Sequence, residues 1–168
     1  MTLRLILTRH AKSSWDMPAT GDHDRPLNAR GREAAQAIGQ WLADNGYAPD
    51  LVLSSDAART RETWALMAAS FATAPKVEWI ADLYHASAKT MLNVLRAGGG
   101  DAKSVLMLGH NPGIAGFAGM LVETPPANPR FRDYPTAATT VMDFAVENWR
   151  AADWGGGTVV DFVVPKEI

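Results

Sequence analysis

The sequence contains no cysteine among its 168 residues. This absence excludes disulfide frameworks, thiolate nucleophiles and cysteine-based zinc sites, and it fits a reducing compartment. The sequence also lacks an excess of one charge, since 16 Lys and Arg against 18 Asp and Glu give a net charge of −2. Such a balance creates no overall field that would attract nucleic acid or an anionic membrane, so we expect neither as a partner.

Long hydrophobic runs are missing as well. The apolar part of the N-terminus extends only from Leu3 to Leu7 and is interrupted by Arg4. A membrane-spanning helix needs about 20 apolar residues, and no other stretch approaches that length. We therefore expect no signal peptide and no membrane span, and a cytoplasmic protein.

What is present is the composition of a globular protein, with 47% hydrophobic and 20% charged residues. A chain of this length buries roughly 70% of its unfolded surface on folding, so its hydrophobic core can stabilise the fold without disulfide bonds. We expect one domain over residues 1–168, because no linker or repeat interrupts it.

Short β-rich segments alternate with segments of helical periodicity. We expect buried strands at 3–8, 51–53 and 104–108, an edge strand at 76–80, and an antiparallel pair at 139–146 and 158–164. Loops are expected at 9–27 and 123–135. This order predicts an α/β fold: a mostly parallel mixed sheet, flanked by helices, with a C-terminal antiparallel strand pair.

Capping residues mark the predicted helices. Asn28 is expected to cap a helix that ends near Gly46, and Ser54 or Ser55 to cap one that continues to Phe71. Two further helices are expected at 87–97 and 112–122, the second with proline in its first turn.

Three charged positions follow predicted strands. Arg9 and His10 come after the first strand, Arg59 lies in the first turn after the second, and His110 follows the strand 104–108. Ligands of open α/β sheets bind outside the carboxyl ends of the strands. If these strands are parallel neighbours, two histidines and two arginines converge on one spot.

Two guanidinium groups and a helix start favour a phosphoryl ligand. A histidine among them could relay a proton or attack phosphorus directly, and direct attack is the simpler interpretation without a cysteine or an evident Ser-His-Asp set. The alternative is structural: each residue alone is more often loop or helix polarity, and His110 could be a buried, hydrogen-bonded histidine.

Other motifs are weaker. Asp22, His23 and Asp24 could be metal ligands, but they lie in a polar loop without helical spacing, so we assign them to a solvated loop. The segment 98–104 (GGGDAKS) lacks the phosphate-loop pattern and precedes a strand, and no GxGxxG is present.

Four segments carry a family resemblance: 5–13 (LILTRHAKS), 25–31 (RPLNARG), 54–63 (SSDAARTRET) and 109–113 (GHNPG), supported by 134–140 (YPTAATT). Together and in this order they resemble the histidine phosphatase superfamily, and the compact chain resembles its SixA-type phosphohistidine phosphatase branch.

The resemblance implies that His10 is the nucleophile and forms a covalent phospho-intermediate. It implies that Arg9 and Arg59 bind the phosphate oxygens and that His110 donates to them. It also implies a phosphoglycerate-mutase-like fold, in agreement with the predicted mixed sheet, and it implies that no metal or organic cofactor takes part. These roles fit the chemistry, because catalysis of phosphoryl transfer depends mainly on stabilising the negative charge that is spread over the phosphoryl oxygens in the transition state.

The sequence departs from the family pattern at two positions. Ala11 stands where glycine is common, which requires a negative φ there. Asp56 stands where many relatives have proline, and it could cap the following helix.

The general acid has the weakest support. In the segment 81–87 (ADLYHAS), Asp82 is the only carboxylate and His85 the other titratable choice. For each of them we slightly favour the alternative of a polar side chain that faces solvent and has no catalytic role. A phosphoramidate needs a strong acid less than an ester does, because its leaving nitrogen is basic. The short segments 81–100 and 123–135 also leave the site open. We therefore predict phosphohistidine on a protein as the substrate.

Two rival functions remain at this stage. One is a small-molecule phosphomonoesterase of the same superfamily. The other is a non-catalytic module that binds phosphate or phosphohistidine, which needs the arginines but no nucleophile. A structural domain with an accidental cluster is the third possibility.

Overall fold

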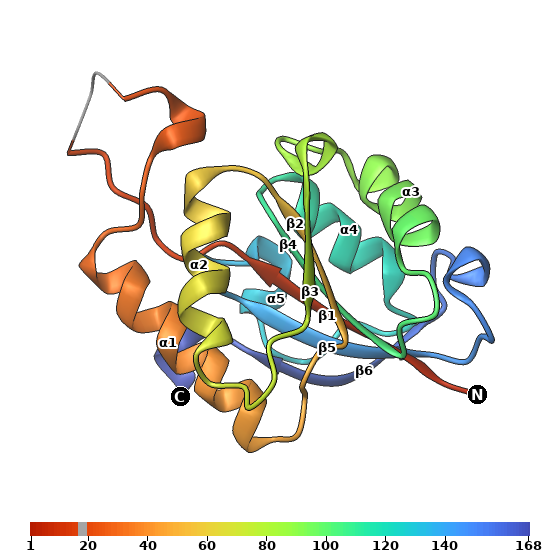
Figure 1. Ribbon diagram of the computed structural model, residues 1–168. Coiled ribbons are helices and arrows are strands. Elements are labelled where there is room, and N and C mark those ends of the chain that lie inside the picture. The colour runs from red at the N-terminus through yellow and green to blue at the C-terminus, as the bar shows by residue number, and fades with distance from the viewer. Residues whose placement is uncertain (17–19) are drawn as a thin grey trace.

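A single six-stranded sheet runs through the computed structural model, which describes residues 1–16 and 20–168 (Figure 1). The strand order is β3-β2-β4-β1-β5-β6. Strands β3, β2, β4 and β1 are parallel to one another. Strand β5 is antiparallel to both of its neighbours, β1 and β6. The bounds are β1 (Leu3–Arg9), β2 (Leu51–Ser55), β3 (Lys76–Ile80), β4 (Ser104–Gly109), β5 (Thr139–Phe144) and β6 (Gly157–Val163). The predicted mixed sheet with a C-terminal antiparallel pair is confirmed.

Helices cover both faces of this sheet. One face carries α1 (Ala29–Asp44) and α2 (Ala58–Ala68), and the other carries α3 (Ala88–Gly98) and α4 (Gly113–Leu121). Shorter elements are α5 (Arg130–Asp133) and the 3-10 turns η1 (Asp22–Asp24), η2 (Ala81–Leu83), η3 (Trp149–Ala151) and η4 (Pro165–Glu167). Two hydrophobic cores therefore sandwich the sheet.

Alternation along the central strands assigns side chains to the two cores. In β1, Leu5 and Leu7 pack with α3 and α4, while Ile6 packs with α1 and α2. Successive strand residues point to opposite faces, so a strand buried on both sides reads as a continuous apolar run. This is why the strands 3–8 and 104–108 were recognisable from the sequence.

The helix caps were only partly predictable. Asn28 caps α1 as expected, its side chain accepting from the Gly31 amide at 2.8 Å. The predicted serine cap is wrong, because Ser54 and Ser55 continue β2 and pair with β3, and the N-cap of α2 is Ala57. That helix ends at Ala68, before the predicted Phe71.

Two other details differ from the prediction. Pro112 is the N-cap of α4 and not its first helical residue. The segment 123–135, predicted as a loop, contains the short helix α5.

The long loop after β1 is anchored to the rest of the molecule. An isolated bridge joins Ser13 to Leu27, and η1 lies between them. Residues 17–19 of this predicted loop lie outside the described residues. Within the described part of the chain, no helix has the length and hydropathy needed to cross a bilayer.

Candidate active site

The carboxyl ends of β1, β2 and β4 bring together the His–Arg cluster: Arg9, His10, Arg59 and His110. Strands β1 and β4 are parallel neighbours with Arg9 opposite Gly109, so His10 and His110 leave the sheet side by side. The His10 amide donates to the Gly109 carbonyl at 3.1 Å, and the two ring centroids lie 5.2 Å apart. Arg59 reaches the same place from the first turn of α2. Three of the four are nearly inaccessible, with His10 6%, Arg59 3% and His110 4% exposed.

The imidazole of His10 is oriented by its own loop. Its Nδ1 lies 2.6 Å from the Ala11 carbonyl oxygen. A carbonyl only accepts, so Nδ1 carries the hydrogen and Nε2 keeps its lone pair. Burial, with the charges of Arg9 and Arg59, lowers the pKa of His10 to about 3, against the opposing effect of the Ala11 hydrogen bond. His10 is therefore a neutral imidazole with Nε2 unprotonated.

His110 is held by a neighbouring strand end. Its Nε2 lies 2.8 Å from the hydroxyl oxygen of Ser55, the last residue of β2. Burial, together with His10 and Arg59, lowers the pKa of His110 to about 2. Both histidines of the cluster are thus uncharged near neutral pH, and the positive charge resides on the arginines.

The cluster contains buried nitrogens that lack hydrogen-bond partners. Within the described residues these are Arg9 Nε, Arg59 Nε and His110 Nδ1, and the only other such side-chain atom is Ser104 Oγ. Buried polar atoms are nearly always paired in folded proteins, so unpaired ones need an explanation. An anion with several acceptor oxygens is the ligand chemistry that would satisfy them.

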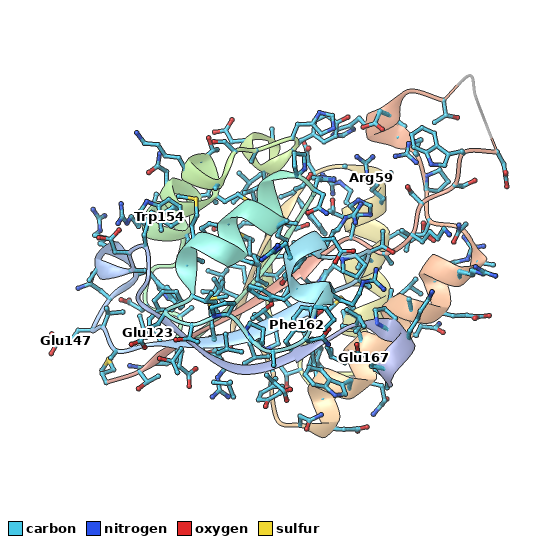
Figure 2. All side chains as sticks on the ribbon, turned by 180° about the vertical axis from the view of Figure 1, so that it is seen from behind. Arg59, Glu123, Glu147, Trp154, Phe162 and Glu167 are labelled. Carbon is cyan, nitrogen blue, oxygen red and sulfur yellow. The ribbon has the colours of Figure 1, made fainter. Side chains whose placement is uncertain are left out.

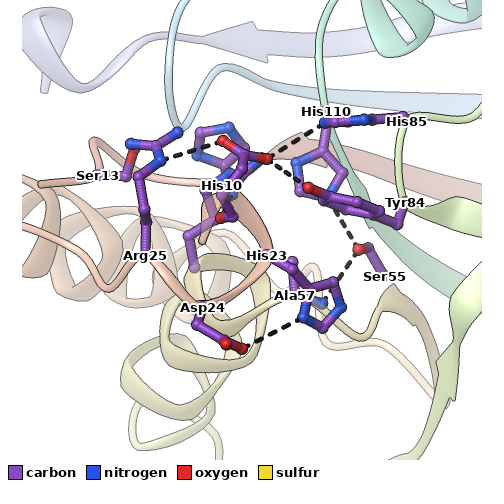
Figure 3. Close-up of polar contacts among 12 residues, drawn as sticks. His10, Ser13, His23, Asp24, Arg25, Ser55, Ala57, Tyr84, His85 and His110 are labelled. Carbon is purple, nitrogen blue, oxygen red and sulfur yellow. Dashed lines mark hydrogen bonds and ion pairs between the residues drawn. The ribbon is translucent and has the colours of Figure 1, made fainter. Parts of the chain in front are cut away.

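A carboxylate also lies at the cluster, and it is Asp22. Its oxygens accept from Arg59 Nη2 and Arg25 Nε, each at 3.1 Å, and from the Tyr84 hydroxyl, while His85 Nε2 lies at 3.4 Å. Figure 3 shows Tyr84 and His85 beside His110, with Arg25 on the other side of His10. The Tyr84 hydrogen bond first, and then the two arginines, lower the pKa of Asp22 well below its usual value. Asp22 is exposed to solvent, as the prediction of a solvated loop requires, but contacts with distant segments also hold it at the site, which the sequence did not indicate.

The other members of the 22–24 segment do not reach the cluster. His23 Nε2 lies 2.8 Å from the Asp56 carboxylate, so Asp56 pairs with the loop and does not cap α2. The hydrogen bond that His23 donates to the Asp56 carboxylate raises the pKa of His23. Among residues 1–16 and 20–168, no group of three or more His, Asp or Glu side chains is arranged to hold a metal ion.

Asp82, the predicted acid, lies exposed on η2. Within the described residues, no hydrogen bond or ion pair joins it to the cluster or to another side chain. Ala11 is fully buried and is not among the residues with positive φ, as its methyl group requires. Its amide donates to Thr63 Oγ1 at 3.0 Å, which fixes the loop that carries His10.

Sequence reasoning missed several residues at this site: Asp22, Arg25, Ser55, Thr63 and Tyr84. Arg25, Ser55 and Thr63 lie inside the segments that carried the family resemblance, but no role could be assigned to them. Tyr84 had no signal in the sequence, and the single feature that marked Asp22 was its place beside His23 and Asp24 in a loop.

Comparison with known proteins agrees with this geometry. Residues 5–83 match the family model of the histidine phosphatase superfamily (branch 1). An uncharacterised chloroplastic protein of Arabidopsis thaliana is 39% identical over 127 residues, which is 70% of this chain and 58% of that protein. The chain thus spans less than two thirds of the length of that relative. An uncharacterised protein of Mycobacterium tuberculosis is 31% identical over 163 residues, covering 94% of this chain and 99% of the relative.

A solved structure extends the similarity to the whole fold. It is that of a candidate phosphohistidine phosphatase, SixA, from Nakamurella multipartitia. It is 30% identical, covers 98% of this chain and 97% of its own, and superposes with a TM-score of 0.83.

Proposed function

The chain belongs to the histidine phosphatase superfamily and is of the SixA type, and from this premise we propose that it hydrolyses phosphoryl groups through a covalent phospho-His10 intermediate. The preferred substrate is phosphohistidine on a protein. The observation that carries the proposal is the His–Arg cluster with its unpaired nitrogens on Arg9, Arg59 and His110. A phosphoryl group offers these nitrogens oxygen acceptors in front of a neutral imidazole.

The reaction begins with attack by the Nε2 lone pair of His10 on phosphorus. A P–N bond to His10 forms while the bond to the substrate breaks, and the leaving nitrogen takes up a proton. Water then attacks the phospho-His10, which releases inorganic phosphate and restores the neutral imidazole. Because Nδ1 donates to the Ala11 carbonyl, the attacking nitrogen needs no deprotonation beforehand.

The arginines and His110 stabilise the negative charge on the transferring oxygens. Guanidinium groups that are already in place stabilise this charge without having to move during the reaction. Such preorganised electrostatic stabilisation is the largest contribution to catalysis of phosphoryl transfer. A Ser55 hydroxyl that donates to Nε2 of His110 leaves the hydrogen of that ring on Nδ1. The unpaired Nδ1 then becomes a donor to the phosphoryl group.

The substrate assignment depends on the carboxylates. The low pKa of Asp22 keeps it ionised, and Asp82 is exposed and forms no hydrogen bond or ion pair with the cluster among the described residues, so neither supports the role of a strong general acid. The imidazole that leaves from a phosphohistidine is basic and accepts a proton readily. An alkoxide leaving from a phosphate ester needs a positioned acid.

Phosphate monoesters are the second candidate, and His85 is the observation that favours them. Its Nε2 lies 3.4 Å from the Asp22 carboxylate, and its ring centroid lies 6.1 Å from that of His110. A ring N–H of His85, oriented by Asp22, could donate to an ester oxygen. The variant His85→Asn separates the two substrates, since ester hydrolysis would fall and phosphohistidine hydrolysis would persist.

Trapping the intermediate tests the proposal. Radiolabelled phosphoramidate is mixed with the protein and quenched in alkali, and we expect an acid-labile label on the wild type. His10→Asn should carry no label, and His23→Asn, which changes a histidine outside the cluster, should carry the wild-type amount. Phosphate release by His10→Asn at the wild-type rate would refute the mechanism, and binding of phosphate without turnover would favour the binding module.

A further inference from the structure

A second cationic site, which we call the basic pocket, lies beyond the loop that carries His10. It is a pocket of about 320 Å³ whose apolar floor includes Ala34, Pro135 and Val164. Its rim carries four cations and no acidic residue: Lys12, Arg30, Arg130 and Lys166. Four of the 16 lysines and arginines of a chain with net charge −2 thus gather around one small cavity.

Most of this charge is not neutralised by the protein. Arg130 forms an ion pair with Asp133 at 3.3 Å, but within residues 1–16 and 20–168 the other three rim cations have no ion-pair partner. The acid beside Lys166 is Glu167, whose carboxylate instead accepts from the Asn128 amide at 2.9 and 3.0 Å. A pocket with this potential attracts an anionic group.

The gathering of four cations is not explained by stabilisation of the segments that carry them. Lys12 comes from the loop after β1, Arg30 from the first turn of α1, Arg130 from α5 and Lys166 from η4. The helix dipole favours acidic residues in the first turn of a helix and disfavours an arginine there. The first turn of α1 nevertheless contains Arg30 and no acidic residue. The dipole adds its own positive potential to that of the side chains.

The basic pocket is close to the proposed nucleophile. Lys12 follows His10 by two residues, so their Cα atoms are at most about 7 Å apart. On the other side, the amide of Ala137, next to pocket residue Thr136, donates to the His10 carbonyl at 3.0 Å. Figure 2 shows Arg59 and the C-terminal turn with Glu167 toward the same end of the molecule, and Glu147 at the opposite end.

We propose that the basic pocket binds an acidic side chain of the substrate protein, located a few residues from the phosphohistidine. This inference rests on the proposed function and adds a specificity site to it. A Glu or Asp carboxylate fits the pocket because its rim offers several cationic donors, while the apolar floor accommodates the methylene groups of the side chain.

Two synthetic phosphohistidine peptides test this inference. They have equal length, and the phosphohistidine is flanked by glutamates in one and by glutamines in the other. We expect kcat/KM of the wild type to be about threefold to tenfold higher for the glutamate peptide at low ionic strength, as two exposed ion pairs allow, and the ratio to fall as salt is added. The double variant Arg30→Gln/Lys166→Gln should bring the ratio close to one.

The matched control is Lys76→Gln/Lys103→Gln, which removes the same charge near the amino ends of β3 and β4. It should keep the wild-type ratio, and an equal loss in both variants would show that net charge alone is responsible and overturn the inference. Equal kcat/KM of the wild type for the two peptides would also overturn it, while leaving the phosphatase assignment intact. No hydrolysis of either peptide or of phosphoramidate would instead refute the proposed function.

Discussion

Burial of His10 in its neutral form should make the stability of the fold depend on pH. Its pKa falls from 6.5 to about 3 on folding, so the unfolded chain binds the proton more readily. The contribution is complete above pH 6.5 and is lost as the pH falls toward 3, at about 1.4 kcal/mol per pH unit. When the pH is lowered from about 7 to about 5, the titration of His10 should therefore reduce the free energy of unfolding by about 2 kcal/mol.

The variant His10→Asn isolates this contribution. Its amide can still donate to the Ala11 carbonyl, but it does not titrate. Urea unfolding, followed by tryptophan fluorescence at the two pH values, should show a smaller loss for the variant by about 2 kcal/mol. Burial, the largest cause of the low pKa of His110, remains in the variant, so His110 loses a similar contribution in both proteins even though the smaller effect of His10 on it is removed. His23→Asn, the control at a histidine whose pKa is raised, should retain the large loss. Parallel losses in wild type and His10→Asn would refute the buried, neutral imidazole.

Three further substitutions address the site and the core. Arg59→Lys keeps a charge but loses the planar fork, and kcat on phosphoramidate should fall about 100-fold or more; a fall below tenfold would contradict its role. Asp22→Asn removes an anion bound to Arg59, so the inhibition constant of inorganic phosphate should drop about threefold to tenfold, and a rise would show that Asp22 assists binding. Tyr134→Phe removes a hydroxyl that donates to the Leu7 carbonyl at 2.6 Å and lies 2.8 Å from Thr140 Oγ1. Urea unfolding should show a loss of about 1–3 kcal/mol, and unchanged stability would contradict this buried bond.

Much of the fold was predictable because its signals are local. The apolar runs 3–8 and 104–108 are buried on both faces of the sheet, and Asn28 caps its helix through an amide three residues away. The serine cap failed because a competing interaction, the pairing of Ser54 and Ser55 with β3, lies outside the reach of a local rule.

The candidate site was partly predictable for a geometric reason. Parallel strands align their carboxyl ends, so His10 and His110, each placed just after such a strand, meet without any further information. Asp22 was not predictable in this way, because its partner Arg59 lies 37 residues away in sequence and reaches it only through the path of a long loop. The direction of that loop depends on the Ser13–Leu27 bridge, which cannot be predicted from the hydrophobic periodicity of the sequence.

The order of residue types along the chain therefore determined the layered architecture, the family and the residues at the strand exits. Only the tertiary structure decided which charges meet. It brought the carboxylate of Asp22 to the arginines and left Asp82 exposed. It also collected Lys12, Arg30, Arg130 and Lys166 from four separate segments around one pocket. The physical reason is that hydrophobic periodicity acts over neighbouring residues, whereas electrostatic contacts depend on distances that exist only after the chain has packed.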